Sequence, residues 1–455
     1  MACFWLNAKE TTINIFTTEE INNVTYYNIK VSVGDCNWKV AHRYNEFYEL
    51  HNQLVIDHGV SKDILPSKKV IRNKCPIFIE SRRKGLEEYL QKTLVFLKRT
   101  MPKSFVEFLE FNLYDIFFLL QDLSAKLFLE SDQILSSKST YFFTVLELHA
   151  LSEFLKKPLL DQTETRFDIS PVVDLCSQLS SITVSGDSKP YLGSNIILNK
   201  LQFDLSPFKC LKVLYLKQVA FESLNSLGSI RCTVQKLHVN HTNATTISQV
   251  LQCDVIHKDN IEGSQKWVSL EILDLNSNNI TEIDSTIKLA LKVTQLSLND
   301  NKISTITNLS HLPNLSQLNL ANNLISICTD LHTRVGNLKT LNLSQNNINC
   351  CKAFSRLYSL ETLDLSCNKI NNVEDIQFLG DLPCLENLVL TGNNVATAVD
   401  YRVKVLEYFG DRAKNLCLDN EKPSQAELDK VSVLRALRIV KEGKTPDLKA
   451  GFAIY

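Results

Sequence analysis

The feature that most constrains this chain is a motif that recurs in its second half. The stretch LEILDLNSNNI, which begins at Leu270, returns five times in similar form, and every copy carries an asparagine at the same place. These asparagines follow one another at steps of 23, 22, 23, 22 and 25 residues; they are Asn278, Asn301, Asn323, Asn346, Asn368 and Asn393. A period of this length predicts a solenoid of stacked units, because one unit is too small to bury its own apolar face.

The pattern L-x-x-L-x-L-x-x-N-x-I resembles the leucine-rich repeats, with a period similar to that of the short cytosolic class. Its alternating leucines predict a short strand in each unit, with the apolar side chains pointing inward. The recurring asparagine is expected to satisfy backbone groups of the tight turn, because its amide both donates and accepts hydrogen bonds. Weaker copies begin at Leu179, Leu211 and Val234 and lack this asparagine, so we interpret them as irregular coils that extend to about residue 260.

Residues between the inward leucines are expected to face the concave surface, which is the usual binding surface of such a solenoid. This surface is small, polar and weakly acidic. The positions predicted to contact a partner protein are Asp274, Ser297, Asn319, Asn342 and Asp364. A solvated surface without a partner is the simpler interpretation of the same residues.

The charge of the chain is unevenly distributed. The formal net charge of -1 argues against general nucleic-acid binding, yet the window from Lys62 to Lys103 holds twelve Lys and Arg residues against four acids. No signal peptide and no apolar run long enough to span a bilayer are recognisable, so any membrane contact is expected to be peripheral. The thirteen cysteines lack C-x-x-C spacing, which favours reduced thiols over a disulfide framework or a zinc site.

The N-terminal part predicts a small antiparallel sheet followed by helices. VTYYNIKVSV alternates in the manner of a strand, GD supplies a hairpin turn, and NWKVAHRY returns as the next strand. A helix is predicted over 45–57, then the basic loop LPSKKVIRNKCP, then a helix over 79–98.

Arg43-Tyr44 at the end of a strand, the Leu-Pro-Ser-Lys loop and ESRRKGLEEYLQKTL together resemble the PX (phox homology) domain, the phosphoinositide-binding fold of sorting nexins. The resemblance implies that Arg43 binds the 3-phosphate and that the Tyr44 ring packs against the inositol. A planar guanidinium can hold phosphate oxygens bidentately, which suits this role. The resemblance also implies that Lys68 meets the 1-phosphate, with Lys69 as a neighbour that could substitute.

The arginine that meets the 4- and 5-hydroxyl side corresponds to Arg82 by the spacing of the family. Helical periodicity does not separate Arg82 from Arg83, because the two flank opposite edges of the apolar stripe of the helix. This stripe consists of Ile79, Leu86, Leu90, Leu94 and Leu97. Arg72 and Lys74 are expected to add nonspecific attraction to anionic lipid. The alternative is that Arg43 pairs with an acid and that the basic run is only a solvated surface.

A PX domain joined to cytosolic leucine-rich repeats resembles the nischarin family, also called imidazoline receptor antisera-selected proteins. The likeness includes HRYNEFYELH, FDLSPFK and DYRVKVLEYFGDRA. It implies a cytoplasmic scaffold, peripheral on early or recycling endosomes, that binds phosphatidylinositol 3-phosphate. It also implies contacts with small GTPases, Rac-activated kinases and integrin cytoplasmic tails in integrin signalling and cell migration. Longer members continue into a coiled coil and a large C-terminal region, whose functions are not assigned to these residues.

We therefore expect an α+β PX domain with a three-stranded antiparallel sheet at 10–115, a helical linker at 116–178, the α/β solenoid at 179–400, and a cap and tail at 401–455. The linker could join the two modules rigidly or form a partner site. A helix with a capping box from Ser424 to Glu427 is predicted to cover the last repeat.

We expect neither catalysis nor a cofactor or metal, because P-loop, G-x-S-x-G and H-E-x-x-H motifs are missing and the histidines form no cluster with ligand spacing. The alternative function is a regulatory subunit whose repeats embrace an enzyme such as a phosphatase, with the PX fold as a protein-contact module. Self-association would strengthen recruitment to a membrane, since one lipid headgroup rarely gives stable residence there.

Overall fold

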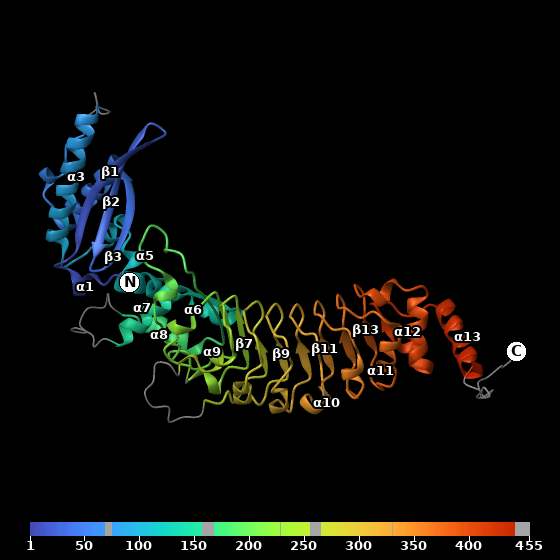
Figure 1. The fold of residues 1–455 in the computed structure, drawn as a ribbon. Helices are drawn as coiled ribbons and strands as arrows, with labels where there is room; N and C mark the ends of the chain where they lie inside the picture. The colour runs from blue at the N-terminus through green and yellow to red at the C-terminus, as the bar shows by residue number, and fades with distance from the viewer. Residues whose placement is uncertain (69–74, 157–167, 228, 255–264, 330, 442–455) are drawn as a thin grey trace. The chain divides into compact units, whose positions relative to one another are not determined.

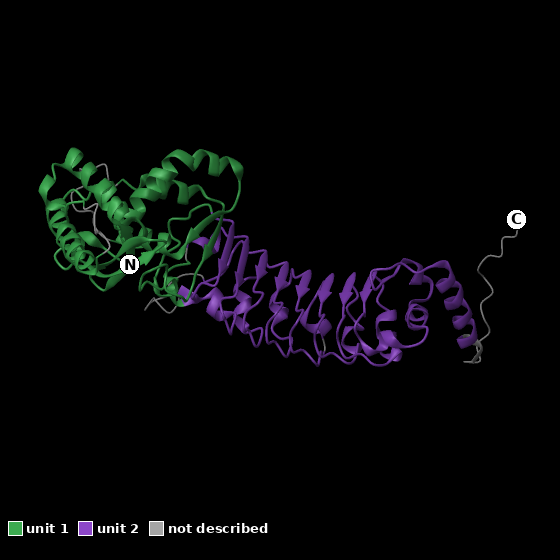
Figure 2. Cartoon of the chain, turned by 90° about the horizontal axis from the view of Figure 1, so that it is seen from above, with its two compact units in different colours: residues 1–210, 222–227 green, residues 211–221, 228–455 purple. Residues whose placement is uncertain are grey.

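The computed structural model describes residues 1–68, 75–156, 168–227, 229–254, 265–329 and 331–441. Figure 1 shows the helices and strands that these residues form. The chain divides into two compact units, which Figure 2 shows in different colours: residues 1–210 with 222–227, and residues 211–221 with 228–455. Within the part of the chain that the structure describes, every helix is too short or too polar to span a bilayer.

The first unit begins with a three-stranded antiparallel sheet in the order β1-β2-β3. Its strands are β1 (Thr12–Ile21), β2 (Val24–Val33) and β3 (Cys36–Arg43). Tyr27, Ile29, Val31 and Val33 alternate along β2 and are all buried, while Gly34 makes the turn to β3 with φ of +54°. The sheet predicted from this alternation is therefore confirmed.

Helices complete the N-terminal domain. They are α1 (Phe4–Asn7), α2 (Tyr44–His58), α3 (Pro76–Leu97), α4 (Lys103–Phe108) and α5 (Phe111–Tyr114). Helix α3 lies along β1, where Gln91 Nε2 donates to the Ile13 carbonyl (3.1 Å) and Glu87 accepts from the Ile15 amide (2.7 Å). Side chains of α3 therefore satisfy backbone groups on the outer edge of β1, which protects that edge from pairing with another chain.

The segment that follows is mostly helical but contains a strand. Its helices are α6 (Ile116–Ser137), α7 (Val145–Lys156) and α8 (Ser170–Gln178). We expected a helical linker over 116–178, whereas Tyr141–Thr144 within it forms strand β4, which pairs in parallel with β5 (Ser181–Ser185). Aromatic and β-branched residues favour a strand when a partner strand is available, and the pairing overrides the local helical pattern.

Among its described residues, the second unit contains a parallel ladder of nine short strands in chain order. They are β6 (Val213–Lys217), β7 (Lys236–Asn240), β8 (Ile272–Asp274), β9 (Gln295–Ser297), β10 (Gln317–Asn319), β11 (Thr340–Asn342), β12 (Thr362–Asp364), β13 (Asn387–Val389) and β14 (Cys417–Leu418). The central leucine of each strand from β8 to β13 is buried. This arrangement confirms the predicted solenoid.

The recurring asparagines occupy buried positions in the turns after the strands. Asn346 Nδ2 donates to the carbonyls of Leu343 (3.0 Å) and Ser344 (3.1 Å) in its own turn, and to that of Leu320 (2.9 Å) in the preceding unit. Its Oδ1 accepts from the Ile325 amide at 3.0 Å. The expected role of the amide is confirmed, and the structure adds that each asparagine also ties its unit to the preceding one.

The C-terminal end is built differently from our expectation. The ladder continues past Asp400, because β14 pairs with β13. The predicted capping box is present, with the Ser424 amide donating to Glu427 Oε2 at 2.8 Å. The helix that it starts, α13 (Gln425–Lys441), packs against α12 (Tyr401–Phe409), and α12 itself packs against the last coils. Since Val431 of α13 is buried but Leu437 is 54% exposed, α12 rather than α13 closes the array.

Candidate functional site

Arg43 stands where β3 ends and α2 begins. Its backbone amide donates to Glu46 Oε2 (3.2 Å) and its side-chain Nε donates to Glu46 Oε1 (3.1 Å), so the two residues start the helix together. The side chain is 46% exposed, and no described residue accepts a hydrogen bond from its two terminal nitrogens. The pairing with an acid that we considered as an alternative is present, but it leaves one edge of the guanidinium available for a ligand.

Glu46 is held as a carboxylate by its surroundings. Burial alone would raise its pKa, but hydrogen bonds from the His42 ring (2.8 Å) and from Arg43 outweigh burial and lower the pKa below its usual value. The negative charge of Glu46 therefore fixes Arg43 at the helix start over the whole neutral pH range.

Tyr44 and Arg82 lie face to face beneath this junction. Tyr44 is buried and its hydroxyl donates to the Pro66 carbonyl (2.5 Å). The Arg82 guanidinium lies between the rings of Tyr44 and Phe78, at 4.3 Å from each centroid. Burial raises the pKa of Tyr44, and the charge of Arg82 partly offsets that rise. The structure thus brings together two residues that the sequence separates by almost forty positions.

Arg82 carries unused donors in a buried place. The residue is 9% exposed, and its Nε and Nη2 atoms have no hydrogen-bond partner among the described residues. A buried charged donor without an acceptor costs free energy, so an arrangement of this kind is typical of a position that waits for an anionic or hydroxyl-bearing ligand.

Arg83 takes a different role from its neighbour. Its guanidinium pairs with Glu80 (2.8 Å) and Glu87 (3.4 Å) and donates to the carbonyl of Ile15 in β1. Helical periodicity did not decide which of Arg82 and Arg83 belongs to the candidate site. In the structure Arg82 lies against Tyr44 and Arg83 contacts the sheet.

A cavity of about 700 Å³ opens beside Tyr44 and contains Lys68 among its lining residues. Several other lining residues were not assigned to the site by the sequence analysis, among them Tyr48, His51, Lys62 and Lys92. Tyr48 and His51 follow Tyr44 at helical spacings of four and seven residues, and this spacing could have identified them. Lys68 Nζ lies 5.9 Å from the Tyr48 ring centroid.

The floor of this cavity depends on a close approach between α3 and the loop before Lys68. A Cβ atom at Gly85 would stand 2.8 Å from Cγ of Pro66, which is closer than real Cβ contacts. Glycine is therefore the residue that lets the loop lie against the helix. Lys69, Arg72 and Lys74 lie outside the described residues, so their predicted roles remain expectations.

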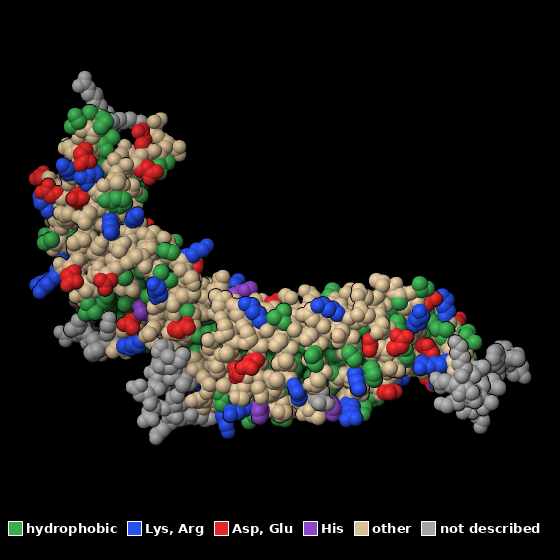
Figure 3. All heavy atoms as spheres, in the orientation of Figure 1, with side chains coloured by type: hydrophobic (Ala, Val, Ile, Leu, Met, Phe, Trp, Pro, Cys, Tyr) green, Lys and Arg blue, Asp and Glu red, His purple; other side chains and the backbone are tan. Residues whose placement is uncertain are grey.

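The predicted concave positions form one column on the second unit. Parallel pairing aligns Asp274, Ser297, Asn319, Asn342 and Asp364 in register across five strands. The part of this face from β6 to β11 is hollowed into a groove of about 500 Å³. On the side of the solenoid visible in Figure 3, basic and acidic side chains are interspersed rather than gathered in one large patch.

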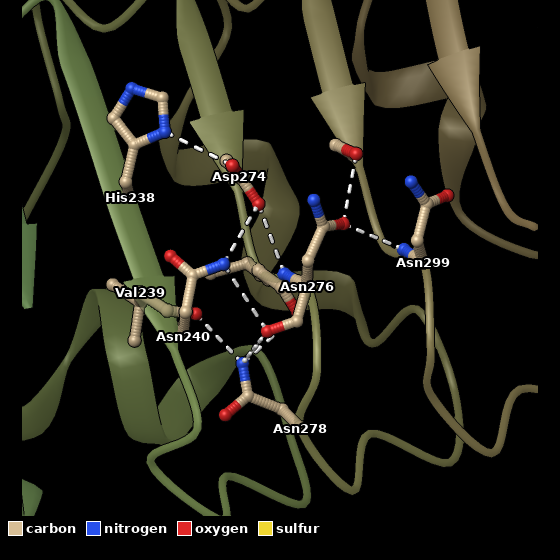
Figure 4. A network of polar contacts seen from close by, with 9 residues as sticks. His238, Val239, Asn240, Asp274, Asn276, Asn278 and Asn299 are labelled. Atoms are coloured by element: carbon tan, nitrogen blue, oxygen red, sulfur yellow. Dashed lines mark hydrogen bonds and ion pairs between the residues drawn. The ribbon is translucent and has the colours of Figure 1, made fainter. Parts of the chain in front are cut away.

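Two aromatic side chains that sequence analysis missed lie at one end of the groove. The rings of Tyr215 and His238 are stacked at 4.4 Å, and His238 Nδ1 lies 3.0 Å from Asp274 Oδ2. Figure 4 shows that the contact between His238 and Asp274 continues into a network through Asn240 and Asn276. Both rings occupy the position of Asp274 in weaker copies of the repeat, so aligning those copies would have revealed them.

Comparison with known families agrees with this division. Residues 32–112 match the PX domain, and residues 269–289 and 337–395 match leucine rich repeats. The chain combines a PX domain with leucine-rich repeats. Both are usually interaction modules without catalytic activity.

Curated proteins resemble parts of the chain. Sorting nexin-24 of Bos taurus is 38% identical over 85 residues, which are 19% of this chain and 48% of that protein. A leucine-rich repeat-containing protein of Schizosaccharomyces pombe is 31% identical over 179 residues, which are 38% of this chain and 29% of that protein. The chain thus spans about half the length of sorting nexin-24.

Solved structures resemble each module separately. An internalin from Listeria monocytogenes is 20% identical and covers 50% of this chain and 71% of its own, with a TM-score of 0.32. A designed CISK-PX domain is 30% identical and covers 22% of this chain and 98% of its own, with a TM-score of 0.21.

Proposed function

We propose that this chain is a phosphoinositide-dependent scaffold. Its PX domain recruits it to endosomal membranes by binding phosphatidylinositol 3-phosphate, and its leucine-rich repeats bind signalling or trafficking proteins. Membership of the nischarin family, inferred from the resemblance, would make small GTPases, Rac-activated kinases and integrin tails the first partners to test. The similarity of 85 residues to sorting nexin-24 supports the recruiting role of the PX domain.

The observation that carries the proposal is the buried Arg82 with two unused donors against the ring of Tyr44. An inositol phosphate supplies what this place lacks, because its hydroxyls and phosphates accept hydrogen bonds from a guanidinium. In this arrangement Arg82 binds the 4- and 5-hydroxyl side, Tyr44 packs against the ring, Lys68 binds the 1-phosphate and Arg43 binds the 3-phosphate.

The test is co-sedimentation of the full chain with liposomes at physiological salt. One set of liposomes contains phosphatidylinositol 3-phosphate, and a second set of equal charge contains phosphatidylserine instead. We expect wild type to bind the first set selectively, and Arg43→Ala and Arg82→Ala to lose that selectivity. Lys84→Ala is the matched control, because this substitution also removes one positive charge from α3, but at a side chain that is 71% exposed.

Equal binding of wild type to both sets would contradict the proposal, and so would selective binding that survives both arginine substitutions. The PX fold would then act as a protein-contact module, as in the hypothesis of a regulatory subunit, and co-purification of a catalytic subunit would be the next observation to seek. Circular dichroism of each variant separates lost binding from lost folding.

A further inference from the structure

The concave face of the solenoid carries uncharged polar side chains on three successive strands, β9 to β11. We call this set the amide block; it consists of Gln295, Gln317, Asn319, Thr340 and Asn342. In-register pairing places Gln295, Gln317 and Thr340 in one column across the strands. The block therefore presents its hydrogen-bonding groups at regular intervals along the solenoid.

Most of these groups are unused within the protein. The side chains of Gln295 and Gln317 make no hydrogen bond to another residue in the described part of the chain. Asn342 uses only its oxygen, which accepts from the Ser344 amide at 2.9 Å. A side-chain amide offers two donors and an acceptor, and a peptide main chain offers one donor and one acceptor at every residue. The amide block therefore matches the main chain of a peptide without requiring particular side chains.

A carboxylate flanks the amide block on each side. Asp274 on β8 and Asp364 on β12 stand in the same column, four strand spacings apart, which corresponds to about 19 Å. In each residue Oδ1 accepts from a backbone amide two residues later, at 3.0 Å from Asn276 and 2.9 Å from Ser366. The second oxygen of Asp364 accepts no hydrogen bond from any described residue, and that of Asp274 faces His238, as Figure 4 shows.

This charge pattern selects the class of ligand. Two fixed carboxylates repel phosphates, so nucleic acids and phosphopeptides are disfavoured, whereas a cationic group is attracted at each end. An extended chain rises about 3.3 Å per residue, so about six residues cover the distance between the carboxylates. Residues six positions apart also point to the same side of an extended chain, because side chains alternate with a period of two.

We propose that the concave face from β8 to β12 binds an extended polypeptide segment that is uncharged in its middle and carries Lys or Arg at two positions six residues apart. Asp274 and Asp364 bind the two cations, and the amide block binds the main chain between them. The inference rests on the proposed function, for which it specifies the kind of partner that the repeats recognise.

The test selects random twelve-residue peptides, displayed on phage, against the immobilised full chain at physiological salt. We expect the enriched peptides to share two basic residues six positions apart. Synthetic copies labelled with fluorescein then give dissociation constants by fluorescence polarisation. Asp364→Asn should weaken binding about tenfold, since a charge-assisted contact is lost, and Gln317→Ala should weaken it about fivefold.

These two substitutions leave the internal hydrogen bonds intact, because Asn keeps the acceptor for the Ser366 amide and Gln317 has no described partner. Gln425→Ala, which removes an amide at an exposed position of α13, is the control and should leave the dissociation constants unchanged. Enrichment without the predicted spacing, or binding that neither Asp364→Asn nor Gln317→Ala weakens, would overturn the proposal. The liposome experiment is independent, since it reports on the PX domain and this selection reports on the repeats alone.

Discussion

At the scale of single residues, the recurring asparagines are the side chains on which the solenoid depends most. Asn346 makes four hydrogen bonds to backbone groups and is buried. Asn346→Leu would keep the size of the side chain but leave those groups unpaired, so we expect a loss of about 1–3 kcal/mol in the free energy of unfolding. Urea denaturation followed by circular dichroism measures the change.

The control for this substitution is Asn394→Leu, because Asn394 is exposed and its side chain bonds only the side chain of Asn371 among the described residues. A change within about 0.5 kcal/mol is expected there. Equal effects of the two substitutions would show that the buried amides contribute no more than surface ones.

Asp115 is a second residue whose effect on stability can be measured, because its carboxyl group is fully buried. Burial raises its pKa to about 7, although its oxygens accept from the amides of Phe4 (2.5 Å), Phe117 (3.0 Å) and Phe118 (3.4 Å), which favour the charged form. A folded-state pKa above the unfolded value of 3.8 means that the folded protein binds the proton more tightly. Its contribution to stability is therefore complete below pH 4 and is lost as the pH rises toward 7.

We expect the melting temperature of the first unit to fall between pH 4 and pH 7 more steeply in wild type than in Asp115→Asn, which cannot ionise. Asn keeps an acceptor for the amides that start α6. Asp174→Asn, at an exposed position, should preserve the wild-type slope. Parallel melting curves for wild type and Asp115→Asn would contradict the buried titration.

At the scale of elements, periodic patterns predicted most of what the structure contains. The alternating apolar residues of β2, the apolar stripe of α3 and the leucine-rich repeat are all patterns within short stretches of sequence. Such local patterns determine which face of an element is buried. Strands β4 and β14 escaped prediction because each is defined by a neighbouring strand rather than by its own pattern. Periodicity also left Arg82 and Arg83 open, since only packing against Tyr44 and Ile15 separates them.

At the scale of the whole molecule, one contact reaches far beyond the domain boundary expected near residue 115. On the open edge of β3, the Lys39 amide donates to the Gly193 carbonyl (3.1 Å) and the Asn195 amide donates to the Asn37 carbonyl (3.0 Å). The Asn195 side chain also accepts from the Asn37 amide at 2.9 Å. No local pattern predicts a contact across more than 150 residues, so the sequence alone did not reveal that a loop near Gly193 covers this edge of the sheet.

This contact makes a prediction about how the first unit folds. A fragment of residues 1–116 would retain the sheet and its helices but lose the loop that covers β3, so the Asn37 and Lys39 amides would face water. We expect these two amides to exchange with deuterium faster in the fragment than in the full chain, while Ile29 in central β2 exchanges slowly in both. Asn195→Ala in the full chain should reproduce part of the acceleration at Asn37 without any truncation. Identical protection of Asn37 in fragment, variant and full chain would mean that the PX domain is complete by residue 116, and that the loop only touches it; faster exchange would place residues up to Asn195 within the same cooperative unit.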